Sequence, residues 1–163
     1  MSARIRPIVL EDLEEVVEMF LEDLASLNIQ HDYDTLESVV KDVILSPSQS
    51  ILLGAESEGI HRLDGVLFAN VYRSVKHGGK AVWLEQLYVR REKRRSGLGR
   101  ELVDSLMDWA EDAGIQGIDL ESYRLNAPAS VLYRSLGFRR LGRERFTFEF
   151  WDEEETSQDE NGD

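Results

Sequence analysis

The stretch RREKRRSGLGREL, residues 90–102, decides how the rest of the sequence is interpreted. Six of the 19 lysines and arginines lie between Arg90 and Arg100, although the chain has 32 acidic residues and a formal charge of −13. The stretch follows a segment rich in β-branched and aromatic residues and precedes an amphipathic one, so it predicts a turn between a strand and a helix. A local basic cluster in an acidic chain favours a compact anion as its ligand.

A helix that begins at such a turn can bind an anion. Its first backbone N–H groups have no partner within the helix, and the aligned peptide dipoles leave partial positive charge there. Gly97 and Gly99 allow a tight bend and a close approach to an oxygen atom, and Arg94, Arg95 and Arg100 add charge. The loop matches neither G-x-x-x-x-G-K-S/T nor G-x-G-x-x-G, and Gly-x-Gly before a helix also fits an ordinary turn. Spacing alone leaves both interpretations open.

Composition limits the class of protein. A chain of 163 residues with 42% hydrophobic residues has the size of one domain with one core. No apolar run approaches the roughly 18 residues of a membrane helix, and the N-terminus is not typical of a signal peptide, so we expect a cytoplasmic protein without a membrane partner. The chain has no cysteine and its three histidines lack ligand spacing, so we expect no metal. The acidity argues against nucleic-acid binding.

The negative charge is concentrated at the C-terminus. Residues 152–163 contain seven acidic residues and no basic one. We expect residues 1–151 to form the folded domain and residues 152–163 to be a disordered, solubilising tail. Attraction of cationic partners is the alternative role for this tail.

Hydrophobic periodicity in the first half predicts two helices followed by a meander. Apolar residues at helical spacing follow a first short strand, and a second helix is expected to begin at Asp34 in the capping box Asp34-Thr35-Leu36-Glu37. Three segments rich in β-branched and aromatic residues come next, separated by glycine turns at Gly59 and residues 78–79. They predict an antiparallel meander.

The second half alternates between helix and strand. A helix follows the basic loop and ends at Gly114, and a short strand begins at Gly117. Asn126 is expected to cap a further helix that ends at Gly137. Residues 143–151 alternate between polar and apolar side chains, which predicts a final strand or hairpin that closes the sheet. The fold class predicted is α+β.

Two segments resemble motifs of the GCN5-related N-acetyltransferases. LEQLYVRREKRRSGLGREL resembles the acetyl-CoA loop of that family, Q/R-x-x-G-x-G/A, as Arg94-x-x-Gly97-x-Gly99. NAPASVLYRSLGF resembles the second motif, N-x-x-A-x-x-L-Y-x-x-x-G-F, from Asn126 to Phe138. The two segments occur in the family's order, separated by one helix and one strand, and the resemblance covers about residues 3–151.

The resemblance implies a mixed, mostly antiparallel sheet of about six to seven strands with about four helices. It implies that the sheet splays between its fourth and fifth strands and holds acetyl-CoA, the co-substrate, in the gap. The backbone amides of residues 95–100 would hold the pyrophosphate, and the fourth strand and Asn126 would contact the pantetheine arm. The expected cofactor-binding residues are Leu87, Tyr88, Val89, Arg94, Arg95, Ser96, Gly97, Leu98, Gly99, Arg100 and Asn126.

The resemblance also implies which residues carry the chemistry. Acetyl transfer to an amine needs a base for the amine and an acid for the leaving thiolate. Tyr133 matches the family tyrosine that protonates the thiolate. Glu121 and Glu85 resemble the base positions of peptide and polyamine acetyltransferases respectively, and either carboxylate could instead orient a substrate ammonium or form a structural ion pair. The choice between them stays open.

The sequence therefore predicts an acetyl-CoA-dependent N-acetyltransferase acting on a primary amine of a small molecule, peptide or protein. The net acidity favours a cationic acceptor, with peptide α-amines as the alternative. A non-catalytic acetyl-CoA-binding module is a second hypothesis, and an interaction protein whose basic loop binds an acidic partner is a third. The resemblance leaves a homodimer open.

Overall fold

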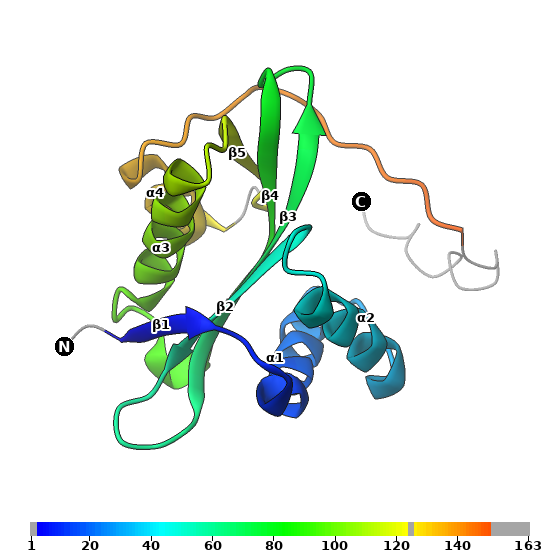
Figure 1. Ribbon diagram of the computed structural model, residues 1–163, viewed down its shortest axis with the longest axis vertical. Helices are drawn as coiled ribbons and strands as arrows, with labels where there is room; N and C mark the ends of the chain where they lie inside the picture. Colours follow the sequence, from blue (N-terminus) through cyan, green and yellow to red (C-terminus); the bar gives the residue numbers. More distant parts are fainter. Residues whose placement is uncertain (1–2, 124–125, 151–163) are drawn as a thin grey trace.

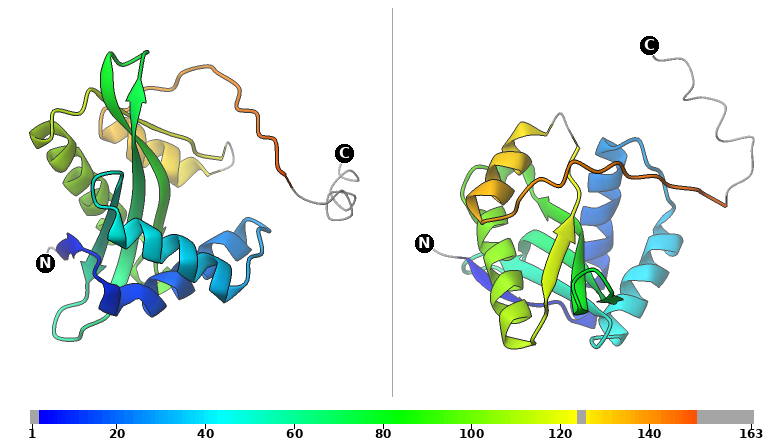
Figure 2. Two further views of the ribbon diagram at one scale, coloured as in Figure 1. Left: turned by 45° about the vertical axis from the view of Figure 1, so that its right-hand side comes forward. Right: turned by 90° about the horizontal axis from the view of Figure 1, so that it is seen from above.

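The computed structural model describes residues 3–123 and 126–150. Helices α1 and α2 cover one face of a central sheet, and α3 and α4 lie on the other (Figures 1 and 2), so the predicted α+β class is confirmed. The expected tail, residues 152–163, lies outside the described residues. In chain order the elements are β1 (Arg4–Pro7), the 3₁₀ helix η1 (Leu10–Asp12), α1 (Leu13–Ser26), α2 (Tyr33–Leu45), β2 (Ser50–Glu56), β3 (Leu63–Ser74), β4 (Gly79–Val89), the 3₁₀ helix η2 (Arg91–Lys93), α3 (Leu98–Asp112), β5 (Gly117–Leu120) and α4 (Ala127–Ser135).

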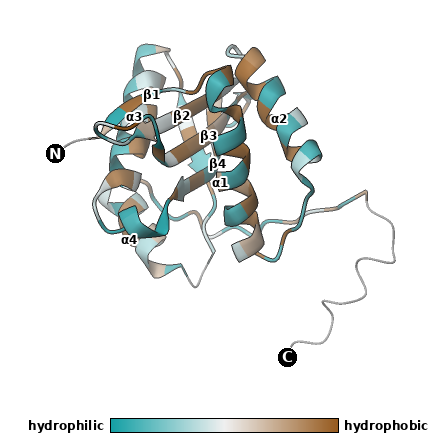
Figure 3. Cartoon of the chain, turned by 90° about the horizontal axis from the view of Figure 1, so that it is seen from below, coloured by the Kyte–Doolittle hydropathy of each residue, from teal (hydrophilic) through white to brown (hydrophobic). Residues whose placement is uncertain are grey.

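The described residues form one sheet of five strands in the order β1-β2-β3-β4-β5. Neighbours from β1 to β4 are antiparallel, which confirms the predicted meander, and β5 is parallel to β4. Many residues of the sheet are hydrophobic, coloured brown in Figure 3, and apolar side chains pack on both of its faces. They form two cores, one with α1 and α2 around Val16 and Met19, and one with α3 around Leu102 and Leu106.

Strand β4 carries a β-bulge at Glu85. The pairing with β3 steps directly from Gln86 to Leu84, which leaves Glu85 as an extra residue. A bulge exchanges the faces to which alternate residues point. Accordingly Leu84 before the bulge and Leu87 after it both pack with the α3 core, whereas Tyr88 packs with the α1 core. The bulge therefore sets which residues of β4 face each side.

Strands β4 and β5 separate where the bulge begins. They pair over four residues only, from Ala81 opposite Gly117 to Leu84 opposite Leu120. Strand β4 nevertheless keeps its pairing with β3 as far as Val89. The end of β4 thus has a strand on one edge and an opening on the other, which confirms the predicted splay.

A polar cluster ties the β3–β4 turn to β5. The Asp119 carboxylate accepts a hydrogen bond from the Tyr72 hydroxyl at 2.7 Å and lies 2.9 Å from Nε2 of His77. Burial raises the pKa of Asp119, but the bonds from His77 and Tyr72 outweigh it and lower that pKa below its ordinary value. The His77 ring packs against Gly117, where a Cβ would clash with it. The cluster holds β5 beside β4 up to the point where they separate.

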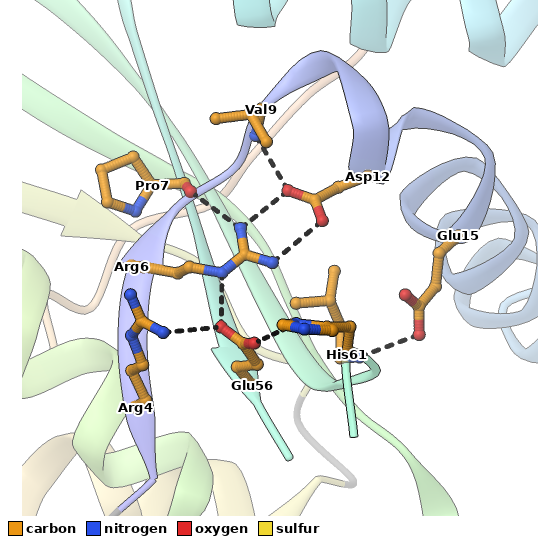
Figure 4. A network of polar contacts seen from close by, with 9 residues as sticks. Arg4, Arg6, Pro7, Val9, Asp12, Glu15, Glu56 and His61 are labelled. Atoms are coloured by element: carbon orange, nitrogen blue, oxygen red, sulfur yellow. Dashed lines mark hydrogen bonds and ion pairs between the residues drawn. The ribbon is translucent and has the colours of Figure 1, made fainter. Parts of the chain in front are cut away.

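A second polar network fastens the N-terminal strand to the sheet and to the start of α1 (Figure 4). The Arg6 guanidinium donates from Nη1 and Nη2 to the two Asp12 oxygens, at 2.7 and 2.9 Å, and from Nε to Glu56 at 2.7 Å. Asp12 also accepts from the backbone N–H of Val9. Bidentate, charge-assisted bonds of this kind are the strong ones. The network therefore fixes the direction in which the chain enters α1.

Two sequence predictions are wrong, one about where α2 begins and one about the number of strands. Helix α2 begins at Tyr33 instead of Asp34, because the side chain of Asp32 caps it and accepts from Thr35 N at 2.7 Å. Among the described residues the sheet has five strands instead of the predicted six to seven.

The missing strand is the C-terminal one. Residues 143–150 have no regular secondary structure, and the last predicted residue, Trp151, lies outside the described part. The segment passes the tip of the β3–β4 hairpin and then runs away from the sheet (Figure 1), and Phe146, Phe148 and Phe150 are 80% to 95% exposed. Alternation alone predicted a strand here, but a strand also needs a partner, and β5 offers an edge only four residues long.

Asp12→Asn tests the N-terminal network through its pH dependence. The bond from Arg6 lowers the pKa of Asp12 below its ordinary value, although burial opposes this. Its stabilisation is therefore present above the unfolded pKa of about 3.9 and is lost as pH falls through the lower, folded value. At pH 7 we expect Asp12→Asn to reduce the free energy of unfolding by about 1–3 kcal/mol, with the difference shrinking below about pH 4. Urea unfolding at several pH values measures this.

The exposed Asp104→Asn on α3 is the matched control, with an expected change within about 0.5 kcal/mol. An Asp12→Asn deficit that stays constant from pH 7 to pH 2 would contradict the assigned role of the carboxylate.

Candidate active site

Three elements converge where the sheet opens. A Cβ added at Gly99, in the first turn of α3, would lie 3.8 Å from Leu87, 3.8 Å from Leu132 and 3.9 Å from Val89. Leu87 and Val89 belong to the open end of β4, and Leu132 belongs to α4. The two segments that the sequence singled out, about 30 residues apart, are thus brought together at the splay.

The basic loop presents an open helix N-terminus. Gly97, the N-cap of α3, has φ 85°, and Arg95 also has a positive φ of 63°. A glycine N-cap has no side chain to accept from the first N–H groups of α3, so these groups remain available to an anion. The Ser96 hydroxyl is turned back onto the loop, where it donates to the Lys93 carbonyl at 2.5 Å.

The arginines of the loop differ in their contacts. Arg94 donates from Nε to the Val89 carbonyl at 2.9 Å, and its guanidinium lies 5.7 Å from the centre of the Tyr88 ring. Arg100 donates from Nη1 to the Ser135 hydroxyl at 2.6 Å, which joins the start of α3 to α4. Arg95 is exposed. Arg94 and Arg100 therefore support the loop as well as adding charge.

Tyr88 faces away from the opening. Its side chain is 3% exposed and packs in the core beneath α1, on the other face of the sheet from Leu87 and Gly99. Burial raises its pKa to about 12. Nearby on α1, burial raises the pKa of Asp23 to about 6, although the cation of Arg94 opposes the shift. Of Tyr88, only the backbone belongs to the open edge.

Helix α4 supplies the candidate acid. Its N-cap Asn126 accepts through Oδ1 from Ala129 N at 3.3 Å, as its place in the motif predicts. The Tyr133 ring is 9% exposed and packs edge-on to Phe138, with 5.8 Å between ring centres. Burial raises the pKa of Tyr133, so its hydroxyl keeps its proton at neutral pH. Tyr133 and Glu121 line the same cavity, of about 1380 Å³.

The two candidate carboxylates border a second cavity, of about 850 Å³, beside α1 and α2. Glu85 sits at the bulge and accepts from the Asn70 amide at 2.8 Å. Glu121, just beyond the end of β5, forms an ion pair with Arg145 at 2.7 Å, and both side chains are about half exposed. The structure therefore brings Glu85 and Glu121 to one cavity, with different partners.

Sequence reasoning missed two residues here. Trp83 lines both cavities, and the Arg145 guanidinium lies 4.6 Å from the centre of its ring. Arg145 belongs to the predicted last strand, and its local sequence pattern does not distinguish it from the neighbouring arginines. The sequence around Trp83 is that of an ordinary aromatic residue in a strand. Trp83 and Arg145 meet only because the C-terminal segment passes close to β4 and the end of β5.

Residues 3–123 and 126–150 contain no group of three or more His, Cys, Asp or Glu side chains placed to hold a metal ion. In the same ranges, no helix combines the length and the apolar character needed to cross a bilayer.

Comparison with known proteins identifies the family. The model of the acetyltransferase (GNAT) family matches residues 13–138, which is more than half of the chain. The chain belongs to the GNAT acetyltransferase family. This confirms the resemblance seen in the two motifs, since both lie within the matched range.

Curated relatives of this GNAT chain include N-acetyltransferase family 8 member 3 of Rattus norvegicus, 32% identical over 104 residues, or 64% of the chain. N-acetyltransferase 8 of Homo sapiens is 33% identical over 67 residues, or 41% of the chain. The matched parts span 45% and 30% of those proteins, so the chain covers less than half the length of either.

Solved structures show the same fold. A ribosomal-protein-alanine N-acetyltransferase from Brucella melitensis has a TM-score of 0.71 at 20% identity, covering 90% of the chain and 99% of that protein. An aminoglycoside N-acetyltransferase in complex with CoA has a TM-score of 0.77 at 17% identity, covering 91% and 95%. At these identities the likeness concerns the fold alone.

Gly97→Ala tests the helix N-terminus of this GNAT chain. A Cβ at this position meets nothing within 4 Å, so only the positive φ is unfavourable to alanine. We expect the free energy of unfolding to fall by about 1–2 kcal/mol and the affinity for coenzyme A to weaken at least about fivefold, because the first amides of α3 shift. Urea unfolding and calorimetric titration with coenzyme A measure the two effects.

Gly99→Ala is the matched control for stability. Its Cβ would make ordinary contacts at 3.8–3.9 Å, so we expect a change within about 0.5 kcal/mol. Wild-type stability and coenzyme A affinity in Gly97→Ala would show that the backbone conformation at this residue is unimportant.

Proposed function

We propose that the chain transfers an acetyl group from acetyl-CoA to a primary amine. The convergence of Leu87 and Val89, Gly99 and Leu132 at the open edge of β4 carries this proposal. The edge can pair with an extended chain, the open N-terminus of α3 can receive a pyrophosphate, and α4 lies opposite with Tyr133. These features fit a long molecule that is anionic near one end.

Acetyl-CoA supplies an acetyl group activated as a thioester. Residues of the chain must then transfer two protons, one away from the amine and one to the leaving thiolate. An amine with a pKa near 10.4 lies about 3.4 units above pH 7, so losing its proton there costs about 5 kcal/mol. A carboxylate next to the amine can accept that proton, and an acid beside the leaving sulfur can protonate the thiolate.

Tyr133 is the proposed acid. Its raised pKa, caused by burial, keeps the phenol protonated throughout the neutral range. Its position on α4, in the same core as Leu87 and Leu132, supports a hydroxyl directed to the place where the pantetheine arm ends. The proton that Tyr133 gives up is regained from solvent between turnovers.

Glu85 is the better candidate for the base. Glu121 already accepts a charge-assisted hydrogen bond from Arg145 at 2.7 Å. Glu85 is exposed and lines the smaller cavity, and among the described residues its hydrogen-bond partner is the neutral Asn70 amide. The bulge that projects Glu85 lies at the splay, which supports its proximity to the reacting amine.

The proposal is tested by release of free coenzyme A from acetyl-CoA over a panel of amines. The panel contains diamines, polyamines, aminoglycosides, amino acids, and peptides with free N-termini or lysines. Release with at least one amine class and acetylation of that amine by mass spectrometry support the proposal. Tight acetyl-CoA binding without turnover on any amine would favour the non-catalytic module instead.

Tyr133→Phe removes only the hydroxyl. We expect kcat to fall about 100-fold while the KM for acetyl-CoA stays within about threefold, because the ring still packs on Phe138. Tyr33→Phe, at the start of α2, is the matched control and should keep wild-type rates. A kcat within twofold of wild type in Tyr133→Phe would exclude this residue as the acid.

Glu85→Gln and Glu121→Gln separate proton transfer from binding. We expect Glu85→Gln to lower kcat about 100-fold while the KM of the amine stays within about threefold, because the amide cannot accept the proton of the amine. Glu121→Gln should act mainly on the KM of the amine, because this carboxylate holds a cation. The reverse pattern in the two variants would assign the base to Glu121.

A further inference from the structure

Arg145 occupies a site made by two other residues. Its guanidinium lies 4.6 Å from the centre of the Trp83 ring and 2.7 Å from Oε2 of Glu121. An aromatic face together with a carboxylate is a combination that binds organic cations, since the ring attracts positive charge and the carboxylate accepts its N–H bonds. The structure thus shows a cation seated where two recognition groups meet.

One recognition group lies in the β4–β5 ladder and the other directly follows it. Trp83 pairs with Asp119 in the regular part of the β4–β5 ladder, and Glu121 follows Leu120, the last paired residue of β5. Arg145, in contrast, comes from residues 143–150, which join no strand among the described residues. The backbone of the site is therefore tied to the sheet, whereas Arg145 comes from a segment without regular secondary structure.

These contacts are weak enough for replacement. The side chains of Arg145 and Glu121 are 55% and 50% exposed. Ion pairs and cation–π contacts at such exposure contribute little, because water and salt compete with them. A soluble cation that makes the same two contacts, and further contacts in the neighbouring cavity, can displace the arginine.

The charges around the site indicate which ligand would enter. The cavity beside α1 and α2 is lined by three glutamates, Glu85, Glu121 and Glu149, and by Arg145 as its single arginine or lysine among the described lining residues. The larger cavity on the other side is lined by seven arginines and lysines against three acidic residues. A cation approaching Trp83 is therefore favoured on the glutamate side, where Glu85 also lies.

We propose that Trp83 and Glu121 form a cation subsite for the acceptor and that Arg145 is an intramolecular stand-in that occupies it in the absence of acceptor. This deepens the proposed function and rests on it: the acceptor class is a molecule with a second cationic group besides the amine that is acetylated. The second group seats on Trp83 and Glu121, and the reacting amine lies toward Glu85. Arg145 lowers the apparent affinity for an acceptor that uses the subsite, by the fraction of time that it fills the subsite.

The test is calorimetric binding of agmatine to the full chain, with no acetyl-CoA present. Agmatine carries a guanidinium and a primary amine, and pentylamine, with one cation, is its matched probe. We expect Arg145→Gln to bind agmatine about five- to tenfold more tightly than wild type, because the subsite is vacated. The affinity for pentylamine should change less than about twofold. Adding Glu121→Gln or Trp83→Leu to Arg145→Gln should remove the gain.

Arg140→Gln is the matched control variant. It removes one positive charge from the wall of the larger cavity, as Arg145→Gln does, but within the described residues Arg145, not Arg140, is the arginine that contacts Trp83 and Glu121. An equal gain in Arg140→Gln would overturn the proposal in favour of a general charge effect. No gain in Arg145→Gln, with native circular dichroism, would overturn it as well.

The binding result is separable from turnover. A gain in agmatine affinity without acetylation of any amine would leave the subsite standing and count against the proposed function. Acetylation of monoamines and diamines at equal kcat/KM, with no agmatine gain, would uphold the proposed function and reject the subsite.

Discussion

The separation of β4 from β5 is the constraint on which the rest of the structure depends. Strand β4 keeps its partner β3 as far as Val89 but loses β5 after Leu84. Backbone hydrogen-bonding groups at an unpaired edge need another partner, so the open end of β4 suits an extended ligand. The bulge at Glu85 turns Leu87 and Val89 toward α3 and α4 at the same place. One irregularity in one strand thus positions the walls of the candidate site.

Charge is distributed to match this geometry. The positive residues of the loop before α3 surround an open helix N-terminus, whereas three glutamates line the cavity beside α1 and α2. Opposite charges at the two ends of one opening suit a reaction between an anionic acyl donor and a cationic amine. Arg145 forms an ion pair with one of these glutamates, Glu121, and neutralises its charge. The C-terminal segment therefore belongs to the electrostatics of the site although it joins no described strand.

Much of the fold and part of the site could be predicted from sequence. The loop from Arg94 to Gly99 and the helix from Asn126 were predictable because backbone requirements at a helix start restrict which residues fit. The start of α2 was misplaced by one residue, since Asp32 and Asp34 both suit an N-cap and only the bond to Thr35 N distinguishes them. The course of residues 143–150 and the contact of Arg145 with Trp83 depend on long-range packing. The local alternation of polar and apolar residues does not reveal such packing.

In the proposed complex, coenzyme A lies along the open edge of β4 with its pyrophosphate at the start of α3. Titration of ¹⁵N-labelled protein with coenzyme A, followed through the backbone amide resonances, tests this most directly. We expect the largest shifts at residues 87–89 and 95–100, with smaller ones at Asn126 and Ala129, at the start of α4. Shifts concentrated at Arg139, Arg140 and Arg143 in the larger cavity, with residues 95–100 unchanged, would contradict it.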